Sequence, residues 1–467
     1  MEKVPDIARH AASFRDPAGF VFEHDGDLFR AVHPDAAEDV DALFSSGLHD
    51  ELVAANLLVA HKRVATAAPL LPADWMLLKP DRLPIISYAS EWTDAQLLAA
   101  ARLTLELQRR ALRHGLSLKD ASSFNVQFLG SRPVFIDLLS FKRIEASRAW
   151  PAYRQFCEHF LAPLALRRHV PQASATNIGL NGVALPVASR MLPARTWLTP
   201  PLALHVHMHA RAAEAGKGRK RVLRTDAIKT VTDFQVQLTI SLAAAVERVR
   251  PRQRDSAWAG YRSNNVYSKR SAEKKLQFVQ QVVTRTGARR ALDLGANDGH
   301  YARALVDMGL ACTAAEIDAA CSERIYASST VRPYDTLLNT VRVDLTNPTP
   351  AHGWAHRERA SFVERMRCDL TLALALIHHL SISHQVPFDE IARFLVDLAP
   401  CAVVEYVPLT DVMSQQLLEA RTGMTEAYLQ TLSEQSFQAA FAPLFDCEAR
   451  SEPIEGGRIL YHFKRRR

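Results

Sequence analysis

The second half of the chain alternates short apolar runs with stretches whose apolar residues recur at helical spacing. Each apolar run has the length of a buried strand, and stretches such as Tyr301–Met308 lie between them. This alternation predicts a parallel sheet covered by helices. A Gly-Gly pair between two final apolar segments predicts a terminal antiparallel hairpin. The predicted parallel strands end at Asp293, Ala315, Val343, Leu376 and Val404, and the hairpin covers Phe445–Ile454 and Arg458–Phe463.

The first half follows another pattern. Strand-like pieces at Gly19–Glu23, Val126–Phe128 and Val134–Ile136 stand among Ala- and Leu-rich stretches, and Asp94–His114 has the pattern of a long helix. A mixed α+β domain is therefore predicted over residues 1–215.

A connecting region is predicted over residues 216–260, before a third region at 261–467. It opens with the basic run Lys217–Arg224 and continues with an amphipathic helix at Phe234–Val249. A solvated connector is the expected role of the basic run, with nucleic-acid contact as the alternative.

Composition narrows the class of protein. The 467 residues are 48% hydrophobic and 23% charged, with a formal net charge of +7, which is ordinary for a globular protein. The six cysteines form no C-x-x-C pair, so reduced thiols in a cytoplasmic protein are expected rather than zinc or disulfides. No signal peptide or membrane span is predicted. The oligomeric state stays open.

The segment Arg290–His300 carries the first chemical signal. An apolar strand runs into Asp293, and Gly295 and Gly299 form a turn before a helix. Glycines at such a turn let a ligand approach the backbone at a helix N-terminus. About 20 residues further on, Glu316 ends the next strand, where a carboxylate can accept both hydroxyls of a ribose.

Further polar residues follow the later strands. Asp344 ends the third strand, His378 and His379 follow the fourth, and Glu405 ends the fifth. Ligands of open α/β sheets bind at the carboxyl ends of the strands, so these positions are candidates for one site.

This series resembles the class I S-adenosylmethionine-dependent methyltransferases. The resemblance implies a Rossmann-like sheet and S-adenosylmethionine as cofactor, with Glu316 on the ribose and Asp344 beside the adenine. It also implies that the glycine turn holds the methionine part. An NAD-binding fold is the alternative explanation of the glycines, and capping of the turn at Thr346–Pro348 is the alternative role of Asp344. The turn residues concerned are Asp293, Gly295, Asn297 and Gly299, where Asn297 replaces a common glycine.

Methyl transfer needs alignment of the acceptor and, for a hydroxyl, removal of a proton. His378, His379 and Glu405 are the candidate catalytic residues, and a histidine suits proton abstraction near neutral pH. The alternative is that a histidine packs in the core or caps a helix. No metal is expected. Tyr261–Lys269 is either a lid over the cofactor or an ordinary helix cap.

The segment Leu118–Phe128 and the following Arg132–Asp137 resemble the catalytic core of protein kinases and aminoglycoside phosphotransferases. The resemblance makes Asp120 the base and Asn125 and Asp137 the magnesium ligands, with Mg²⁺ and ATP needed only if the domain is active. No glycine-rich loop or phosphate-binding lysine is visible, and Arg30 is the nearest substitute for the lysine. A degenerate kinase-like fold is therefore predicted. The alternative is that Asp120 caps a turn and Asp137 anchors a loop.

The whole chain also resembles bacterial methyltransferases related to nodulation host-specificity proteins and surface-polysaccharide loci. This resemblance implies O-methylation of a saccharide or another small cell-envelope molecule. The alternatives are a bifunctional kinase–methyltransferase acting on a glycan and a non-catalytic scaffold with a degraded cofactor site. Nucleic acid is not an expected partner, because Ala375-Leu-Ile-His378 replaces the Asn/Asp-Pro-Pro-Tyr motif of base methylation.

Overall fold

The computed structural model describes residues 7–64, 71–145, 149–170, 179–214, 228–252, 256, 269–421 and 423–466. The chain forms two compact units. The basic run at 217–224, the candidate lid at 261–268 and Arg467 lie outside the described residues. The first unit comprises residues 1–129, 133–252 and 352–359, and the second comprises 130–132, 253–351 and 360–467.

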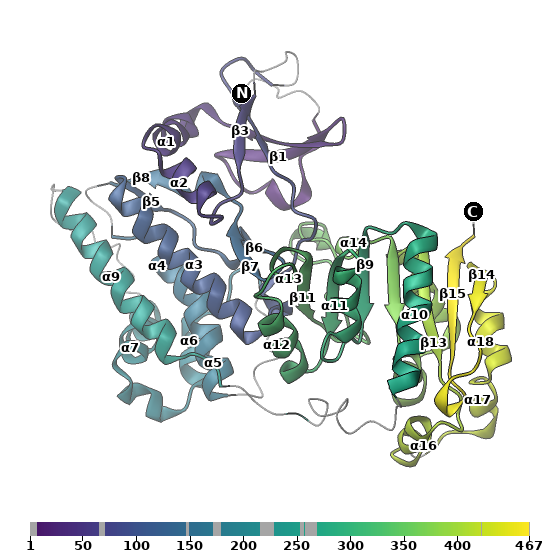
Figure 1. The fold of residues 1–467 in the computed structure, drawn as a ribbon. Coiled ribbons are helices and arrows are strands. Elements are labelled where there is room, and N and C mark those ends of the chain that lie inside the picture. Colours follow the sequence, from purple (N-terminus) through teal and green to yellow (C-terminus); the bar gives the residue numbers. More distant parts are fainter. Residues whose placement is uncertain are drawn as a thin grey trace. The chain divides into compact units, whose positions relative to one another are not determined.

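A seven-stranded sheet forms the centre of the second unit (Figure 1). Its strand order is β11-β10-β9-β12-β13-β15-β14. The first five of these strands are parallel, and β15 is antiparallel to both of its neighbours. The strands are β9 (Arg290–Leu294), β10 (Ala311–Glu316), β11 (Leu338–Arg342), β12 (Leu370–Ala373), β13 (Cys401–Tyr406), β14 (Phe445–Arg450) and β15 (Ile459–Arg465).

The central strands of this sheet are buried on both faces. Every residue of β12 and β13 is buried, as expected for parallel strands covered by helices on each side. On one face, Leu372 and Val403 join the core with Val279 and Leu305. Near the C-terminus, Phe437 of the helix over residues 434–441 packs against Phe463 of β15. The predicted α/β class and the parallel sheet with its antiparallel final strand are confirmed.

Helices of the second unit follow the strands in turn. α10 packs on β13 and β15, and α11 packs on β9 (Figure 1). α11 also packs on β10, α12 packs on β10 and β11, and α15 packs against α14 and α18. They are α10 (Lys269–Thr286), α11 (His300–Asp307), α12 (Ala319–Ser328), α13 (Tyr334–Leu337), α14 (Phe362–Arg365), α15 (Phe388–Leu398), α16 (Val412–Glu419), α17 (Glu426–Gln430) and α18 (Glu434–Phe441), with the single-turn helices η11 (His379–Ser383) and η12 (Glu455–Gly457).

The first unit contains a four-stranded antiparallel sheet of order β1-β2-β4-β3 and two small two-stranded sheets, β5-β8 and β6-β7. Phe20, Phe22 and Ala31 form the apolar face of the larger sheet with Leu71 and Leu77. The strands are β1 (Gly19–His24), β2 (Asp27–Val32), β3 (His61–Val64), β4 (Met76–Pro80), β5 (Leu116–Leu118), β6 (Val126–Leu129), β7 (Arg132–Phe135) and β8 (Phe141–Arg143).

The long helix predicted before the Asp120 segment is present as α3. Thr93 and Gln96 form a capping box at its start, and most of its apolar side chains are buried. The helices are α1 (Pro34–Ser45), α2 (Leu48–Ala54), α3 (Asp94–Arg113), α4 (Tyr153–Phe156), α5 (Ala162–His169), α6 (Leu185–Met191), α7 (Pro200–Leu202), α8 (His209–Glu214) and α9 (Ile228–Arg248). The shorter helical turns are η1 (Ala11–Ser13), η2 (Ala89–Glu91), η3 (Ser123–Asn125), η4 (Leu138–Ser140), η5 (Cys157–Leu161), η7 (Ala194–Leu198), η8 (Ala203–Met208) and η10 (Trp354–His356).

The boundaries of the two units differ in two respects from those of the three regions predicted from the sequence, 1–215, 216–260 and 261–467. The helix expected in the connecting region, α9, packs against α3 in the first unit, because its buried residues, such as Leu242 and Val246, need an apolar partner. The segment 352–359 also belongs to the first unit, where Glu358 accepts two hydrogen bonds from Arg15 at 2.8 and 2.9 Å.

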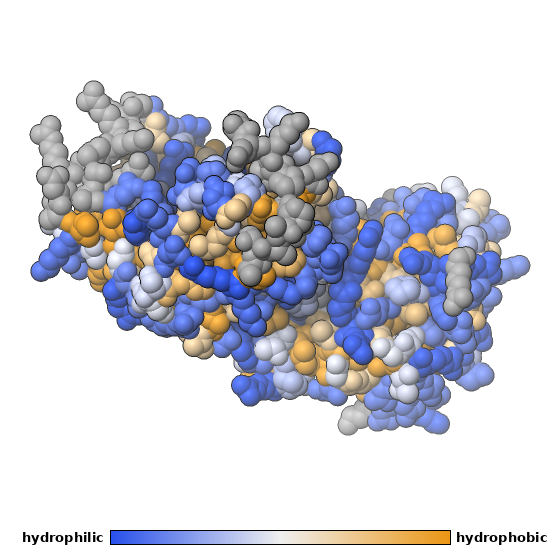
Figure 2. Space-filling model, turned by 90° about the horizontal axis from the view of Figure 1, so that it is seen from above, coloured by the Kyte–Doolittle hydropathy of each residue, from blue (hydrophilic) through white to orange (hydrophobic). Residues whose placement is uncertain are grey.

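The surface has the mixed character of an ordinary globular protein. On the face in Figure 2, hydrophilic residues predominate and hydrophobic residues occupy smaller areas between them. None of the helices in the described part of the chain combines the length and the apolar character that crossing a membrane requires.

We expect Val403→Ala to lower the free energy of unfolding of the second unit by about 2 kcal/mol, because two buried methyl groups are lost and a cavity remains. Val403 is fully buried at the centre of the sheet. The matched control is Val331→Ala, since Val331 is 59% exposed. Urea denaturation followed by circular dichroism measures the difference, and equal effects of the two substitutions would contradict this packing.

Candidate functional site

The predicted glycine turn connects β9 to α11 at the carboxyl end of the sheet. Gly295 and Gly299 have φ angles of +68° and +76°, and Asn297 has a φ of +49°. These left-handed conformations suit glycine, and asparagine tolerates them better than most residues. The Ala315 carbonyl accepts hydrogen bonds from the Gly295 and Ala296 amides at 2.9 and 3.1 Å. The turn is therefore fastened to the neighbouring strand β10.

Glu316, the predicted ribose acid, ends β10 beside this turn. Its Oε2 accepts a hydrogen bond from the Asn297 amide at 2.6 Å, and its Oε1 accepts one from the Asp318 amide at 2.7 Å. The pKa of Glu316 is raised, because the effect of burial is larger than the opposing effect of these two amides. The carboxylate thus joins the loop after β9 to the loop after β10.

Asp293 lies on β9 below the turn and is almost completely buried. Its Oδ2 has no hydrogen-bond partner among the described residues. Burial, reinforced by the charge of Glu316, raises the pKa of Asp293 to about 7. A cationic group placed nearby would favour the ionised carboxylate.

Asp344, the predicted adenine-side residue, makes the turn contacts that the sequence also allowed for it. Its Oδ1 accepts hydrogen bonds from the Thr346 amide at 2.9 Å and the Thr346 hydroxyl at 2.7 Å. The preceding residue, Val343, donates from its amide to the Glu316 carbonyl at 3.0 Å. Asp344 therefore caps a turn at the same edge of the sheet as Glu316.

The two candidate histidines follow β12, and their ring centroids lie 4.2 Å apart. His378 is 2% exposed, and neither of its ring nitrogens has a hydrogen-bond partner in the described residues. Burial lowers the pKa of His378 well below its usual value and lowers that of His379 to about 4. Both rings are therefore neutral near pH 7, the form that can accept a proton.

Glu405 occupies a buried charge network rather than an open position. Its Oε1 lies 2.6 Å from Lys275 Nζ and 3.6 Å from Arg458 Nη1. Its Oε2 accepts a hydrogen bond from the Ala375 amide at 2.9 Å. Arg458 in turn donates two hydrogen bonds of 2.8 Å to Asp411. With no exposed surface, Glu405 is placed to fix the segment after β12.

The glycine turn and the histidine segment are in contact. A Cβ atom at Gly295 would lie 3.1 Å from Leu376 Cδ1. Since Leu376 lies two residues before His378 and follows the anchored Ala375, the turn, the histidines and the Glu405 network form one continuous region. The structure thus brings the predicted residues of the second unit together at the carboxyl ends of β9 to β13.

The residues present fit S-adenosylmethionine, which carries a ribose diol and cationic groups. Glu316 supplies acceptor oxygens, Asp293 supplies a buried oxygen without a partner among the described residues, and the turn has the backbone conformation of a close approach. Ile317, 56% exposed directly after Glu316, adds an apolar surface.

Sequence reasoning missed Ile317, Leu376, Lys275 and Arg458. A signal for Lys275 existed, because it lies three, four and seven residues before the buried Phe278, Val279 and Val282. A lysine on the apolar stripe of a helix indicates a buried ion pair. No local pattern marks Arg458.

The kinase-like residues also come together within the first unit. Asp120 Oδ1 accepts a hydrogen bond from the Ser122 amide at 2.7 Å, and burial followed by the charge of Asp137 raises its pKa. Asn125 Nδ2 donates to Ser140 Oγ at 3.1 Å. Ser140 Oγ donates to Asp137 Oδ2 at 2.6 Å.

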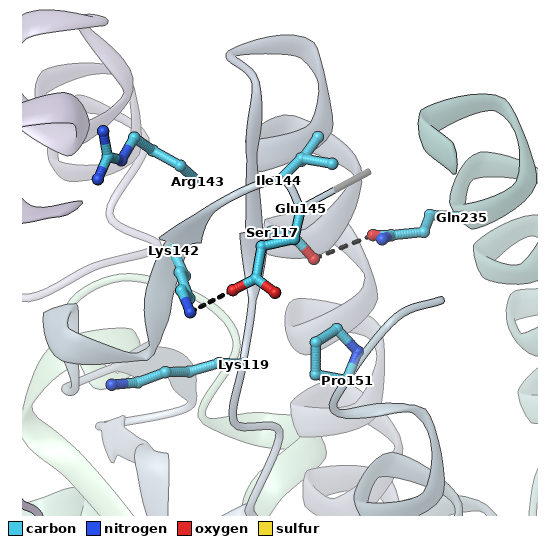
Figure 3. Close-up of a pocket in the computed structure, with 8 residues that line it drawn as sticks. All are labelled: Ser117, Lys119, Lys142, Arg143, Ile144, Glu145, Pro151 and Gln235. Carbon is cyan, nitrogen blue, oxygen red and sulfur yellow. Dashed lines mark hydrogen bonds and ion pairs between the residues drawn. The ribbon is translucent and has the colours of Figure 1, made fainter. Parts of the chain in front are cut away.

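A separate pocket of about 240 Å³ lies beside β5 and β8 in the first unit (Figure 3). Lys142 pairs with Glu145, and Arg143 pairs with Glu38 and Asp39, so much of the cationic charge of the lining is neutralised. Asp120, Asn125 and Asp137 are not among the lining residues, so the pocket is distinct from the kinase-like cluster. The lining residues are Ser117, Lys119, Lys142, Arg143, Ile144, Glu145, Pro151 and Gln235.

Comparison with known proteins gives one full-length relative. The chain is 30% identical over 483 residues to the nodulation protein NoeA of Rhizobium meliloti (strain 1021), and the alignment covers 99% of this chain and 97% of that protein. No family model matches the chain.

Three solved structures are similar at low TM-scores. The PH0226 protein from Pyrococcus horikoshii OT3 has a TM-score of 0.31 and 11% identity, covering 43% of this chain and 94% of its own. The N-methyltransferase NodS from Bradyrhizobium japonicum WM9 has a TM-score of 0.30 and 10% identity, covering 43% and 99%. The bifunctional kinase-methyltransferase WbdD has a TM-score of 0.29 and 13% identity, covering 42% and 39%.

We expect Arg458→Met to lower the free energy of unfolding of the second unit by about 3–5 kcal/mol, because Asp411 loses both hydrogen bonds and the Glu405 network loses one cation. Lys464→Met, at an exposed position of the strand β15 that follows Arg458, is the control. Chemical denaturation compares the two variants. A loss no larger than that of the control would show that the network contributes little.

Acidification should destabilise the second unit through His379. The unfolded ring accepts a proton near pH 6.5 and the folded ring only near pH 4, so stability is complete above pH 6.5 and declines as the pH falls towards 4. His379→Gln should remove up to about 3 kcal/mol of this decline. His24→Gln, on the exposed end of β1, is the control. Urea unfolding midpoints at pH 4.5 and pH 7 measure the decline in stability for the wild type and each variant. A decline in His379→Gln equal to that of the wild type would contradict the burial argument.

Proposed function

The chain belongs to the family of the nodulation protein NoeA, and from this premise we propose that it is an S-adenosylmethionine-dependent methyltransferase that acts on a hydroxyl group of a saccharide or another small cell-envelope molecule. The strand order of the second unit, with its antiparallel β15, agrees with the Rossmann-like sheet that the resemblance to class I methyltransferases implies. The observation that carries the proposal is the joint placement of Glu316, the turn Gly295–Gly299 and the two histidines at one edge of its sheet.

The cofactor side of the site consists of residues from β9 and β10. We assign binding of the methionine part to the turn Gly295–Gly299 with Asp293 beneath it, and binding of the ribose hydroxyls to Glu316. Glu316 already accepts hydrogen bonds from Asn297 and Asp318, so its carboxylate is held in one orientation before any ligand arrives. Asp344 belongs to the adenine side through its turn beside Val343, which bonds to Glu316.

When bound, S-adenosylmethionine supplies a methyl group already activated on a sulfonium. The remaining tasks of the protein are to orient the acceptor hydroxyl and to take its proton. A neutral imidazole of His378 or His379 provides the basic nitrogen for that proton, and its lowered pKa keeps it neutral throughout the physiological range. Glu405 acts through the Ala375 amide as a positioning residue for this segment.

A hydroxyl acceptor accounts for these histidines better than a readily methylated thiolate would, because a hydroxyl keeps its proton at neutral pH and needs a base. The buried ring of His378 has two nitrogens without partners among the described residues, and an acceptor hydroxyl would satisfy one of them. The resemblance to polysaccharide-locus methyltransferases favours a saccharide as the molecule that bears this hydroxyl.

Calorimetric titration of the full chain with S-adenosylmethionine tests the cofactor assignment. We expect saturable binding by the wild type and about 10- to 100-fold weaker binding by Glu316→Gln, since charge-assisted hydrogen bonds of about 1.5–3 kcal/mol are weakened. Glu419→Gln, at the exposed end of α16, is the matched control and should bind like the wild type.

The acceptor assignment has its own readout. Transfer of a radiolabelled methyl group to a panel of mono- and oligosaccharides should fall in His378→Gln and His379→Gln while cofactor affinity is kept. Absence of cofactor binding by the wild type would refute the methyltransferase proposal. Cofactor binding together with transfer that is independent of both histidines would refute the role of the base alone.

A further inference from the structure

The kinase-like cluster of the first unit, Asp120, Asn125 and Asp137, contains two carboxyl groups. Its resemblance would make Asn125 and Asp137 ligands of a magnesium ion that carries ATP. A magnesium ion requires carboxylate oxygens that are free to bind it. The fit of this ion therefore depends on what the two oxygens of Asp137 contact in the folded chain.

Both oxygens of Asp137 are occupied by protein groups. Arg30 Nη1 donates a hydrogen bond of 2.8 Å to Oδ1, and Ser140 Oγ donates one of 2.6 Å to Oδ2. Asn125 Nδ2 donates to the same Ser140 hydroxyl, so its side chain is joined to the Asp137 cluster through the amide nitrogen. Each oxygen of Asp137 thus already accepts a protein donor, and the Arg30 guanidinium already neutralises the negative charge that would attract a magnesium ion.

The ion pair of Arg30 and Asp137 is largely shielded from water. The side chains are 11% and 16% exposed, whereas the Lys79–Asp27 pair on the same sheet is 43% and 52% exposed. A charge-assisted hydrogen bond strengthens as water is removed, and breaking such a pair leaves an uncompensated charge. Arg30 comes from β2 and Asp137 follows β7, so the pair also links two sheets of the first unit.

Arg30 is the cation that neutralises Asp137 in the described part of the first unit. His61 lies nearby and is 3% exposed, but burial and the positive charge of Arg30 lower its pKa to about 3. Its Nδ1 hydrogen-bonds to the Val59 carbonyl at 2.7 Å. His61 is therefore neutral near pH 7 and adds no charge to Asp137.

We propose that the guanidinium of Arg30 takes the place of the magnesium ion, so that the cluster of Asp120, Asn125 and Asp137 is a fixed structural centre and not a site of ATP turnover. Arg30, which stands in place of a phosphate-binding lysine, thus binds Asp137 instead of a nucleotide. The first unit keeps the kinase-like arrangement of its residues with an internal cation in place of an external one.

Thermal unfolding of full-length variants with and without MgCl₂, at matched ionic strength, tests the substitution of cation for metal. The wild type should have the same melting temperature in both conditions. Arg30→Gln should melt at a lower temperature and recover part of the loss with MgCl₂, because a ligand that binds only the folded state raises its stability. The double variant Arg30→Gln with Asp137→Asn should lose this response to magnesium. Lys79→Gln is the control and should show neither effect.

A second measurement keeps the test decisive if Arg30→Gln does not fold. Calorimetric titration of the wild type with ATP in the presence of MgCl₂ should give no saturable binding. Magnesium-dependent ATP binding that is lost in Asp137→Asn would overturn the proposal. It would also be overturned by an Arg30→Gln variant that melts like the wild type and does not respond to magnesium.

Discussion

The buried carboxylate of Glu405 joins several separate elements of the second unit beside the candidate site. It lies on the strand β13, pairs with Lys275 from α10 and Arg458 from the approach to β15, and accepts the amide of Ala375 after β12. A buried charge is tolerated only when it is paired and hydrogen-bonded. Because its partners come from three separate elements, the network can form only when those elements are correctly packed. The position of the histidine segment depends on it.

The succession of strands along the chain and the edge of the sheet that bears the candidate site were predictable from the sequence. Short apolar runs that each end in a polar residue, such as those ending at Asp293 and Glu316, are marked by local pattern alone. Parallel topology then brings the strand ends to one edge. The left-handed conformation of Asn297 was likewise foreseeable from the tolerance of asparagine for positive φ.

Partners that lie far apart in the sequence were not predictable. Most of the strands of the sheet lie between Lys275 and Glu405 in the sequence. No pattern in the residues around Arg458 indicates that it pairs with two carboxylates, those of Glu405 and Asp411. Asp344 shows the same limit at short range, since a strand-end aspartate can serve a ligand or a turn and the sequence left both open. In the first unit, Arg30 was noticed as a replacement for a lysine, but only the fold reveals that it contacts Asp137.

The placement of residues 352–359 has a consequence for how this polypeptide can be divided. These residues lie between two stretches of sequence that belong to the second unit, yet Glu358 bonds to Arg15 and the Arg359 guanidinium lies 4.5 Å above the Phe124 ring in the first unit. Conversely, Gly130 donates its amide to Asn339 within the second unit. No single cut of the chain therefore leaves both units with all of their residues.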